Sequence, residues 1–203
     1  MGQDNDGRTR VDESAKRARL VRYAVETIAE EGFAKASLSH IATRAGVSKG
    51  VISYHFAGKE ELIQEVVTSV MADMGEAVFS RMDEQPGAVG KLRAYIESVV
   101  AYMRVHQAEL LAVVEIARSR PGGSGTSDLT GSDPVVRVLA ALLAQGQEEG
   151  ELRDFPPRLM ALWLQAMINA LLMELVARGD ELDLDLAARE LITVFELATH
   201  RRA

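Results

Sequence analysis

Four side chains in the first third of the sequence have the types and spacing to bind nucleic acid. Lys49, Ser53 and Tyr54 fall on the free side of a short predicted helix, and Lys59 follows at the start of the next one. An ammonium group or a hydroxyl can donate hydrogen bonds to phosphate oxygens and base edges. Gly50 would let a partner approach the backbone closely. These residues therefore suggest contact with DNA rather than catalysis.

The surrounding segment predicts two short helices that are separated by a tight turn. Apolar residues recur at helical spacing from Leu38 to Ala42, after Ser37 as the N-cap, and Ile52 and Phe56 form a second stripe. Gly46 can adopt the positive φ that ends one helix and lets the next leave at a steep angle. A short helix with small, basic and aromatic residues on its free face is typical of the helix-turn-helix that enters the DNA major groove.

The stretch VSKGVISYHFAGKEEL, with GFAKASLSHIATRAG before it, closely resembles the TetR family of bacterial transcriptional regulators. The resemblance covers roughly residues 20–62 and includes the spacing, the turn glycine, the aromatic cluster and the lysine that follows. The rest of the chain resembles the family in its helical character and length. The resemblance implies an all-α protein with an N-terminal three-helix DNA-binding bundle and a C-terminal helical bundle for ligand binding and dimerisation.

The resemblance also implies which residues contact DNA. They are Ser37, Ser48, Lys49, Gly50, Val51, Ser53, Tyr54, His55 and Lys59. Tyr54 and His55 match the family's phosphate-contacting pair, although His55 has the alternative role of capping its own helix. Lys59 stands near a helix N-terminus, where its charge opposes the helix dipole, and a phosphate would account for it. Val51, Ser53 and Ala36 depart from the family's commoner residues, which weakens any transfer of the family's operator sequence to this chain.

The composition favours a helical, cytoplasmic protein. Of 203 residues, 47% are hydrophobic but only 5% are aromatic, which suits helices with a Leu/Ala/Val/Ile/Met core. The absence of cysteine excludes disulfides and cysteine-ligated zinc, and favours a reducing compartment. The polar start predicts no signal peptide, and no uninterrupted apolar run reaches about 18 residues, so no membrane span is expected.

Charge is distributed unevenly along the chain. The net charge is −7, yet residues 1–60 contain 10 lysines and arginines against 8 acidic residues, a balance of +2, which leaves −9 for the rest. Basic side chains can gather on one face of the first part, while the acidic remainder is repelled from phosphate.

The pattern of helices divides the chain into three parts. We expect a disordered arm at 1–13, a helix-turn-helix domain at 14–57 and an effector-binding and dimerisation domain at 58–203, with about nine helices in all. Residues 119–134 are rich in Gly, Ser and Pro and predict a flexible loop. Outside the helix-turn-helix, helices are expected at 14–31, 59–82, 88–106, 108–119, 134–149, 158–178 and 184–200.

The last two predicted helices are apolar on more than one face, which one subunit cannot easily cover. By resemblance they form a homodimer interface, and the alternative is that they are wholly subunit core. The residues assigned to dimerisation are Leu159, Trp163, Met167, Leu171, Leu191, Val194 and Phe195.

The family places an effector site within the C-terminal body. Residues that could line it are Met71, Met74, Tyr95, Tyr102, Met103, His106, Trp163, Met167 and Asn169, with Phe79 and Gln165 as further candidates. Methionine adapts to irregular apolar ligands, and a few polar groups would orient them. Ordinary core packing is the alternative for each residue, and the identity of the effector does not follow.

The sequence therefore predicts a ligand-responsive regulator that binds a palindromic DNA operator as a dimer, with no cofactor and no metal. Release by a small, largely apolar effector would make it a repressor, and activation stays open because it depends on the operator's position. No phosphate loop, H-E-x-x-H or G-x-S-x-G motif is present, and the four histidines are scattered, so an enzyme is not expected. The remaining alternative is a helical adaptor that binds only protein partners.

Overall fold

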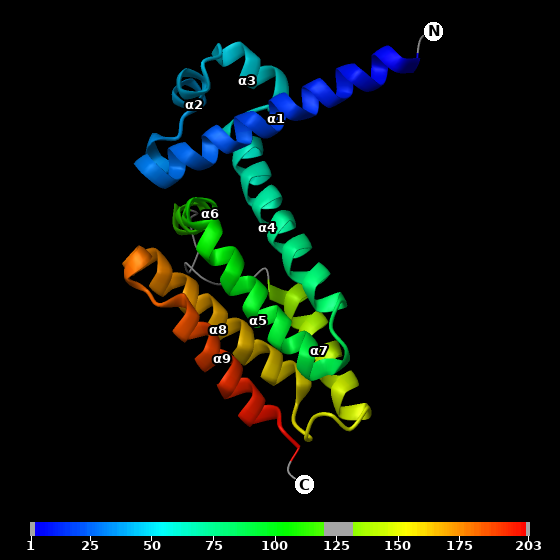
Figure 1. Ribbon diagram of the computed structural model, residues 1–203. Coiled ribbons are helices and arrows are strands. Elements are labelled where there is room, and N and C mark those ends of the chain that lie inside the picture. Colours follow the sequence, from blue (N-terminus) through cyan, green and yellow to red (C-terminus); the bar gives the residue numbers. More distant parts are fainter. Residues whose placement is uncertain (1–2, 120–131, 202–203) are drawn as a thin grey trace. The chain divides into compact units, whose positions relative to one another are not determined.

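Helices make up the fold over the residues that the structure describes. The computed structural model describes residues 3–119 and 132–201, which form nine α-helices, two short 3-10 helices and no strand (Figure 1). The α-helices are α1 (Gln3–Glu31), α2 (Leu38–Ala45), α3 (Lys49–His55), α4 (Lys59–Asp83), α5 (Gly87–Val105), α6 (Gln107–Ser119), α7 (Ser132–Glu148), α8 (Pro157–Arg178) and α9 (Leu184–Thr199). The predicted all-α fold with about nine helices is confirmed.

The first helix is longer than the sequence predicts. α1 begins at Gln3, so residues 3–13 are helical rather than a disordered arm. Once its apolar stripe is anchored, each further residue adds one backbone hydrogen bond, which lets a helix continue into a polar segment. The remaining helices begin and end within two residues of expectation. Residues 120–131 of the expected loop lie outside the described part of the chain.

The described chain forms two compact units. The first lies within residues 1–71 and 108–121, and the second within 72–107 and 122–203. The boundary that we expected after residue 57 falls inside the first unit. The reason is that Leu62 and Val66 of α4 and Ala112 and Ile116 of α6 all belong to the first unit's core.

The core of the first unit is built from the predicted apolar stripes of α1, α2 and α3. Its most deeply buried side chains include Ala24, Ile28, Ile41, Ile52 and Phe56. Burying a large apolar side chain contributes roughly 1.5–3 kcal/mol. The 7-residue α3 therefore depends on Ile52 and Phe56 for its position, which leaves its other side chains outside the core.

The second unit contains the end of α4 together with α5, α7, α8 and α9. α7 packs against α8 and α5, and α9 packs against α5 and α8. Gly146 permits the close approach of α7, because a Cβ at this position would collide with the Cβ of Ala88 on α5. Leu139, Leu143 and Leu164 are fully buried in this unit.

α8 is the most apolar helix of the described chain. Together with the short 3-10 helix that follows it (Gly179–Glu181), it is long and apolar enough to cross a membrane. The mean hydropathy of its most apolar 18-residue stretch is 1.7, and 33% of that stretch is buried. The sequence predicts no span because no uninterrupted apolar run reaches about 18 residues. Length and composition alone are weak support for a span, because the core helix of a soluble protein can have the same composition.

Candidate nucleic-acid interface

The helix-turn-helix is fixed by its caps and its turn. Ser37 Oγ accepts a hydrogen bond from the backbone N–H of His40 at 3.2 Å, which caps the start of α2. Gly46 ends α2 with φ of 67°, and the N–H of Val47 donates to the carbonyl of Ala42 at 3.0 Å. Ser48 takes the N-cap position of α3 without a side-chain cap bond, so its hydroxyl is available for an external partner.

The outer face of α3 carries the side chains that the sequence placed there. Ser48, Lys49, Gly50, Val51, Ser53 and Tyr54 are all exposed. Tyr54 is 74% exposed, an unusual degree for an aromatic side chain, whereas His55 is half-buried beside it with the two rings edge to face at 5.1 Å. We call the six exposed residues, without His55, the α3 face.

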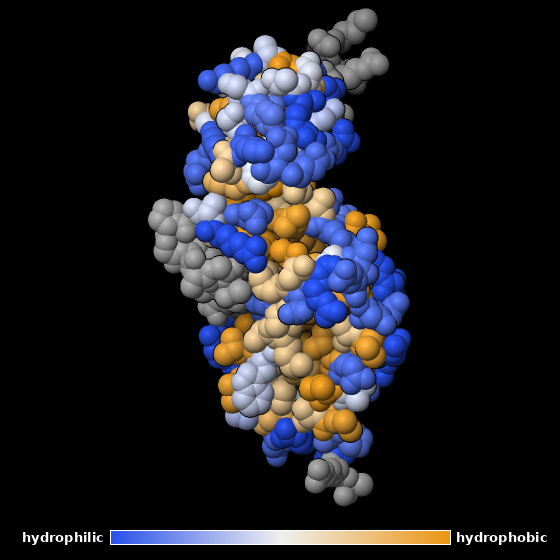
Figure 2. Space-filling model, turned by 90° about the vertical axis from the view of Figure 1, so that its left-hand side faces the viewer, coloured by the Kyte–Doolittle hydropathy of each residue, from blue (hydrophilic) through white to orange (hydrophobic). Residues whose placement is uncertain are grey.

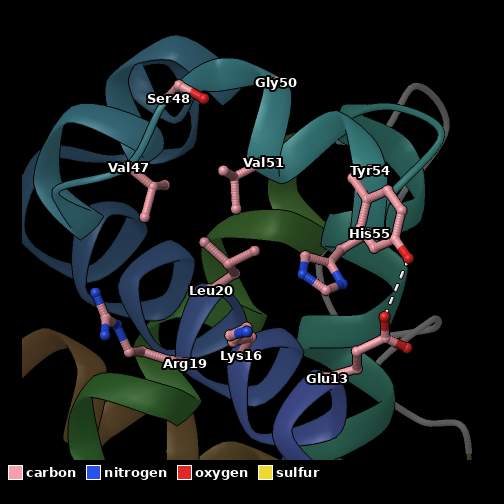
Figure 3. Close-up of a pocket in the computed structure, with 10 residues that line it drawn as sticks. All are labelled: Glu13, Lys16, Arg19, Leu20, Val47, Ser48, Gly50, Val51, Tyr54 and His55. Atoms are coloured by element: carbon pink, nitrogen blue, oxygen red, sulfur yellow. Dashed lines mark hydrogen bonds between the residues drawn. The ribbon is translucent and has the colours of Figure 1, made fainter. Parts of the chain in front are cut away.

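A groove separates α3 from α1. It has a volume of about 580 Å³, and Figure 3 shows Leu20, Val47 and Val51 inside it, with charged residues of α1 along one edge. Lys16 and Arg19 belong to that edge, although Arg19 is engaged with the carbonyl of Ala45 at 3.0 Å. The groove thus combines an apolar floor with a charged rim.

One acidic residue on this rim contacts the α3 face. The hydroxyl of Tyr54 donates a hydrogen bond to Glu13 Oε1 at 3.0 Å (Figure 3). This hydrogen bond and the negative charge of Glu13 raise the pKa of Tyr54. Nothing in the sequence singles out Glu13, because it stands 41 residues from Tyr54 and in the segment expected to be disordered.

Arg17 is committed to contacts inside the protein. Its Nη1 donates to the carbonyl of His55 at 2.5 Å, its Nη2 pairs with Glu65 at 2.9 Å, and its guanidinium lies 4.2 Å from the centre of the Phe56 ring. The hydrogen bond to Glu65 is the main cause of its raised pKa. Arg17 therefore holds the C-terminal end of α3 between α1 and α4.

Lys59 also has a partner within the chain. Its ammonium donates to the carbonyl of Phe33 at 3.1 Å and lies 4.1 Å from the centre of the Phe33 ring. A carbonyl and an aromatic face explain a lysine at this position without a phosphate. Lys59 is partly buried, so we assign it a structural contact in addition to the predicted role on DNA.

The dimerisation residues predicted on α8 and α9 divide into two groups. Leu159, Trp163, Met167 and Val194 are exposed, with Trp163 53% exposed. Leu171, Leu191 and Phe195 are instead buried against their own chain, because they lie on the core-facing sides of their helices.

Further apolar residues extend the exposed group. With Leu162, Leu186 and Leu197, the four exposed residues form what we call the α8/α9 face. Figure 2 shows that orange and tan, apolar atoms gather in the lower part of that side of the molecule, beside blue ones. A hollow of about 370 Å³ between the two helices is lined by Trp163, Met167 and Val194 among others.

The predicted effector residues are not gathered at one place. Tyr95 and Met103 are buried, and Tyr102 stacks on His106 with ring centres 4.1 Å apart beside a groove of about 490 Å³. Met71 is exposed and belongs to the first unit. Met74 is half-buried, and Trp163 and Met167 lie on the α8/α9 face. Asn169 is linked through Gln165 to Tyr95.

Family comparisons agree with this geometry. Residues 20–66 match the model described as bacterial regulatory proteins, tetR family, and residues 85–173 match a tetracyclin repressor-like C-terminal domain. The chain is 35% identical to the HTH-type transcriptional regulator BetI 1 of Chromohalobacter salexigens over 85 residues, which are 42% of this chain and 41% of that protein. It is 28% identical to the BetI regulator of Cronobacter sakazakii, over 89% of this chain and 88% of that protein.

Solved structures share the fold. A transcriptional regulator from Pseudomonas aeruginosa PAO1 superposes with a TM-score of 0.76 at 24% identity, covering 91% of this chain and 90% of that one. A regulator from Saccharomonospora viridis, solved in complex with choline, gives 0.77 at 22% identity, covering 93% and 100%.

The two domain matches and the helix-turn-helix geometry define a class of non-enzymatic DNA-binding regulators. The chain belongs to the TetR family of transcriptional regulators. The first curated relatives are matched over only about two fifths of their own length.

Proposed function

We propose that this regulator binds a palindromic DNA operator as a homodimer in the cytoplasm, and that a small, largely apolar effector releases it. In this mechanism the protein acts as a repressor. The observation that carries the proposal is the α3 face, where hydroxyl, ammonium and phenol groups project from a helix that is held by a buried core.

The α3 face supplies two kinds of DNA contact. Lys49 and Ser53 project from the start and the middle of α3, where side chains of a reading helix meet base edges. Val51 can contact a thymine methyl group. Tyr54 and His55, with Ser37 and Lys59, are assigned to the phosphates, which fix orientation without reading sequence.

Homodimer formation is supported by the α8/α9 face. Exposed apolar side chains that cluster on two neighbouring helices mark a surface that a partner covers. Two copies related by a two-fold axis would present two α3 helices to one palindrome, which gives the specificity that a single short helix lacks.

Effector release requires coupling between the two units. α4 begins in the first unit and ends in the second, so an effector that changes the second unit can shift α3. The effector would favour an arrangement of the protein that binds the operator weakly. The coupling is reciprocal, so the factor by which the effector lowers operator affinity equals the factor by which the operator lowers effector affinity. One structurally similar regulator was solved in complex with choline, which supports a small-molecule effector without specifying its chemistry.

The test is a gel-shift titration on DNA that flanks the protein's own gene, with excess competitor DNA at near-physiological salt. Tight, competitor-resistant binding to a short palindrome by the wild type, with loss in Lys49→Ala, would support the proposal. Binding that is weak on every sequence would call for selection from random DNA. A complete failure to bind DNA would overturn the proposal and favour the protein-binding adaptor.

A further inference from the structure

A chain of polar side chains crosses the apolar core of the second unit. The Tyr95 hydroxyl on α5 donates to Gln165 Oε1 on α8 at 2.8 Å, and Gln165 Nε2 donates to Asn169 Oδ1 at 3.0 Å. Tyr95 is 2% and Gln165 8% exposed. The other buried side chains of this unit are mainly leucine, isoleucine, valine, alanine and methionine.

The direction of these hydrogen bonds follows from Tyr95. Burial raises the pKa of its hydroxyl, which stays neutral and has one proton to donate. Gln165 Oε1 accepts that proton, and Gln165 Nε2 in turn donates a hydrogen bond to Asn169 Oδ1.

The path ends in a donor without an acceptor. Asn169 Nδ2 is buried and has no hydrogen-bond partner among the described residues. A buried amide in this condition destabilises the fold, and a group of the same size without polar atoms would be better tolerated. Hydrogen bonds that run in one direction also polarise the amide at the end, which strengthens it as a donor.

From this path we propose that the effector presents a hydrogen-bond acceptor oxygen, such as a carbonyl, to Asn169 Nδ2. The effector is therefore a largely apolar molecule that carries this acceptor oxygen. This inference rests on the proposed effector site and specifies its ligand class.

Two probes of matched shape test the ligand class. N,N-dimethyloctanamide carries an acceptor oxygen and no donor, whereas octyltrimethylammonium carries the same chain and a cation with no acceptor. We expect the amide, in hundredfold excess over its Kd, to raise the Tm of the wild-type protein by about 5 °C or more. The ammonium probe should leave the Tm unchanged.

Asn169→Asp keeps the oxygen that accepts the hydrogen bond from Gln165, and it replaces the Nδ2 donor group with a second oxygen. This variant should lose the response to the amide probe. Glu84→Gln, at an exposed position in the same unit, is the matched control and should respond as the wild type does.

The side-chain NH2 resonances of Asn169 give a direct readout in a ¹H–¹⁵N spectrum, where Asn169→Asp identifies them by their loss. The amide probe should move this pair downfield. An unmoved pair, an equal response to both probes or no response to either probe would each overturn the inference. DNA binding in the gel-shift titration would still stand in those cases, which separates this failure from failure of the proposed function.

Discussion

The hydroxyl of Tyr54 on the α3 face donates its one hydrogen bond to the carboxylate of Glu13 on α1, at 3.0 Å. A DNA phosphate at Tyr54 would require the same proton and would be repelled by the carboxylate. Glu13→Gln removes the charge, so we expect DNA affinity to rise by up to about fivefold, the scale of an exposed ion-pair energy.

Fluorescence anisotropy on one operator duplex would measure this effect. Tyr54→Phe in the Glu13→Gln background should cancel most of the gain. Equal affinities of the wild type and Glu13→Gln would show that breaking the Tyr54–Glu13 hydrogen bond costs DNA binding no free energy.

Lys49 is predicted to act on DNA alone. Its side chain is exposed at the first position of α3 and contributes nothing to the first unit's core. Lys49→Ala should weaken operator binding, reduce the salt dependence by about one phosphate or alter base preference, and leave the Tm unchanged. A lowered Tm would assign Lys49 a structural role.

Lys59 is predicted to behave differently because of Phe33. Loss of the carbonyl hydrogen bond and the aromatic contact should destabilise the fold by about 1 kcal/mol, which lowers the Tm by roughly 2–4 °C. Lys59→Ala should weaken binding to all sequences equally if the lysine also reaches phosphate. Thermal melting and salt titrations of Lys49→Ala and Lys59→Ala, side by side, separate the two roles.

The contacts of Glu31 predict that part of the fold's stability is lost in acid. His40 Nε2 at 2.9 Å and Arg44 Nη1 at 3.0 Å hydrogen-bond to its carboxylate, and the His40 contact is the main reason why its pKa lies below the ordinary 4.5. A carboxylate with a lowered folded-state pKa stabilises the fold above its unfolded pKa, and this contribution is lost as the pH falls through the folded pKa.

Glu31→Gln should therefore have a lower Tm than the wild type at neutral pH, and the difference should shrink below about pH 4.5. Thermal melting across pH 3–7 would measure it. A constant difference across that range would place the stabilisation elsewhere.

The α8/α9 face predicts a variant that separates the subunits. Trp163→Glu puts a charge on this exposed apolar surface and should convert dimers into folded monomers, which light scattering on a sizing column would detect. Leu171→Ala is the contrasting variant, because Leu171 packs within its own chain. It should lower stability by about 2–5 kcal/mol while the mass stays that of a dimer. Unchanged mass in Trp163→Glu would contradict the assignment of this face.

The sequence predicts most of the helices because their signals are local. Ile52 and Phe56 stand four residues apart, and Ser37 and Gly46 mark the ends of α2, so periodicity and capping locate the helix-turn-helix. Partners that are distant along the chain carry no such signal. The contact of Lys59 with Phe33 spans 26 residues, and only the fold brings the two together.

Periodicity also left the orientation of α8 undecided. This helix is apolar around most of its circumference, so Trp163 and Leu171 read alike in sequence, although one is exposed and the other buried. Their difference depends on where α5 and α7 pack, which is a property of the tertiary structure.

The membership of Ala112 and Ile116 in the first unit's core has a consequence for dissecting this protein. Residues 1–71 contain the whole helix-turn-helix, yet a fragment cut there would lose α6 and leave the apolar sides of Leu62 and Val66 partly uncovered. The DNA-reading module is thus discontinuous along the chain. A substitution in α6, more than fifty residues beyond α3, acts directly on the packing that supports the reading helix.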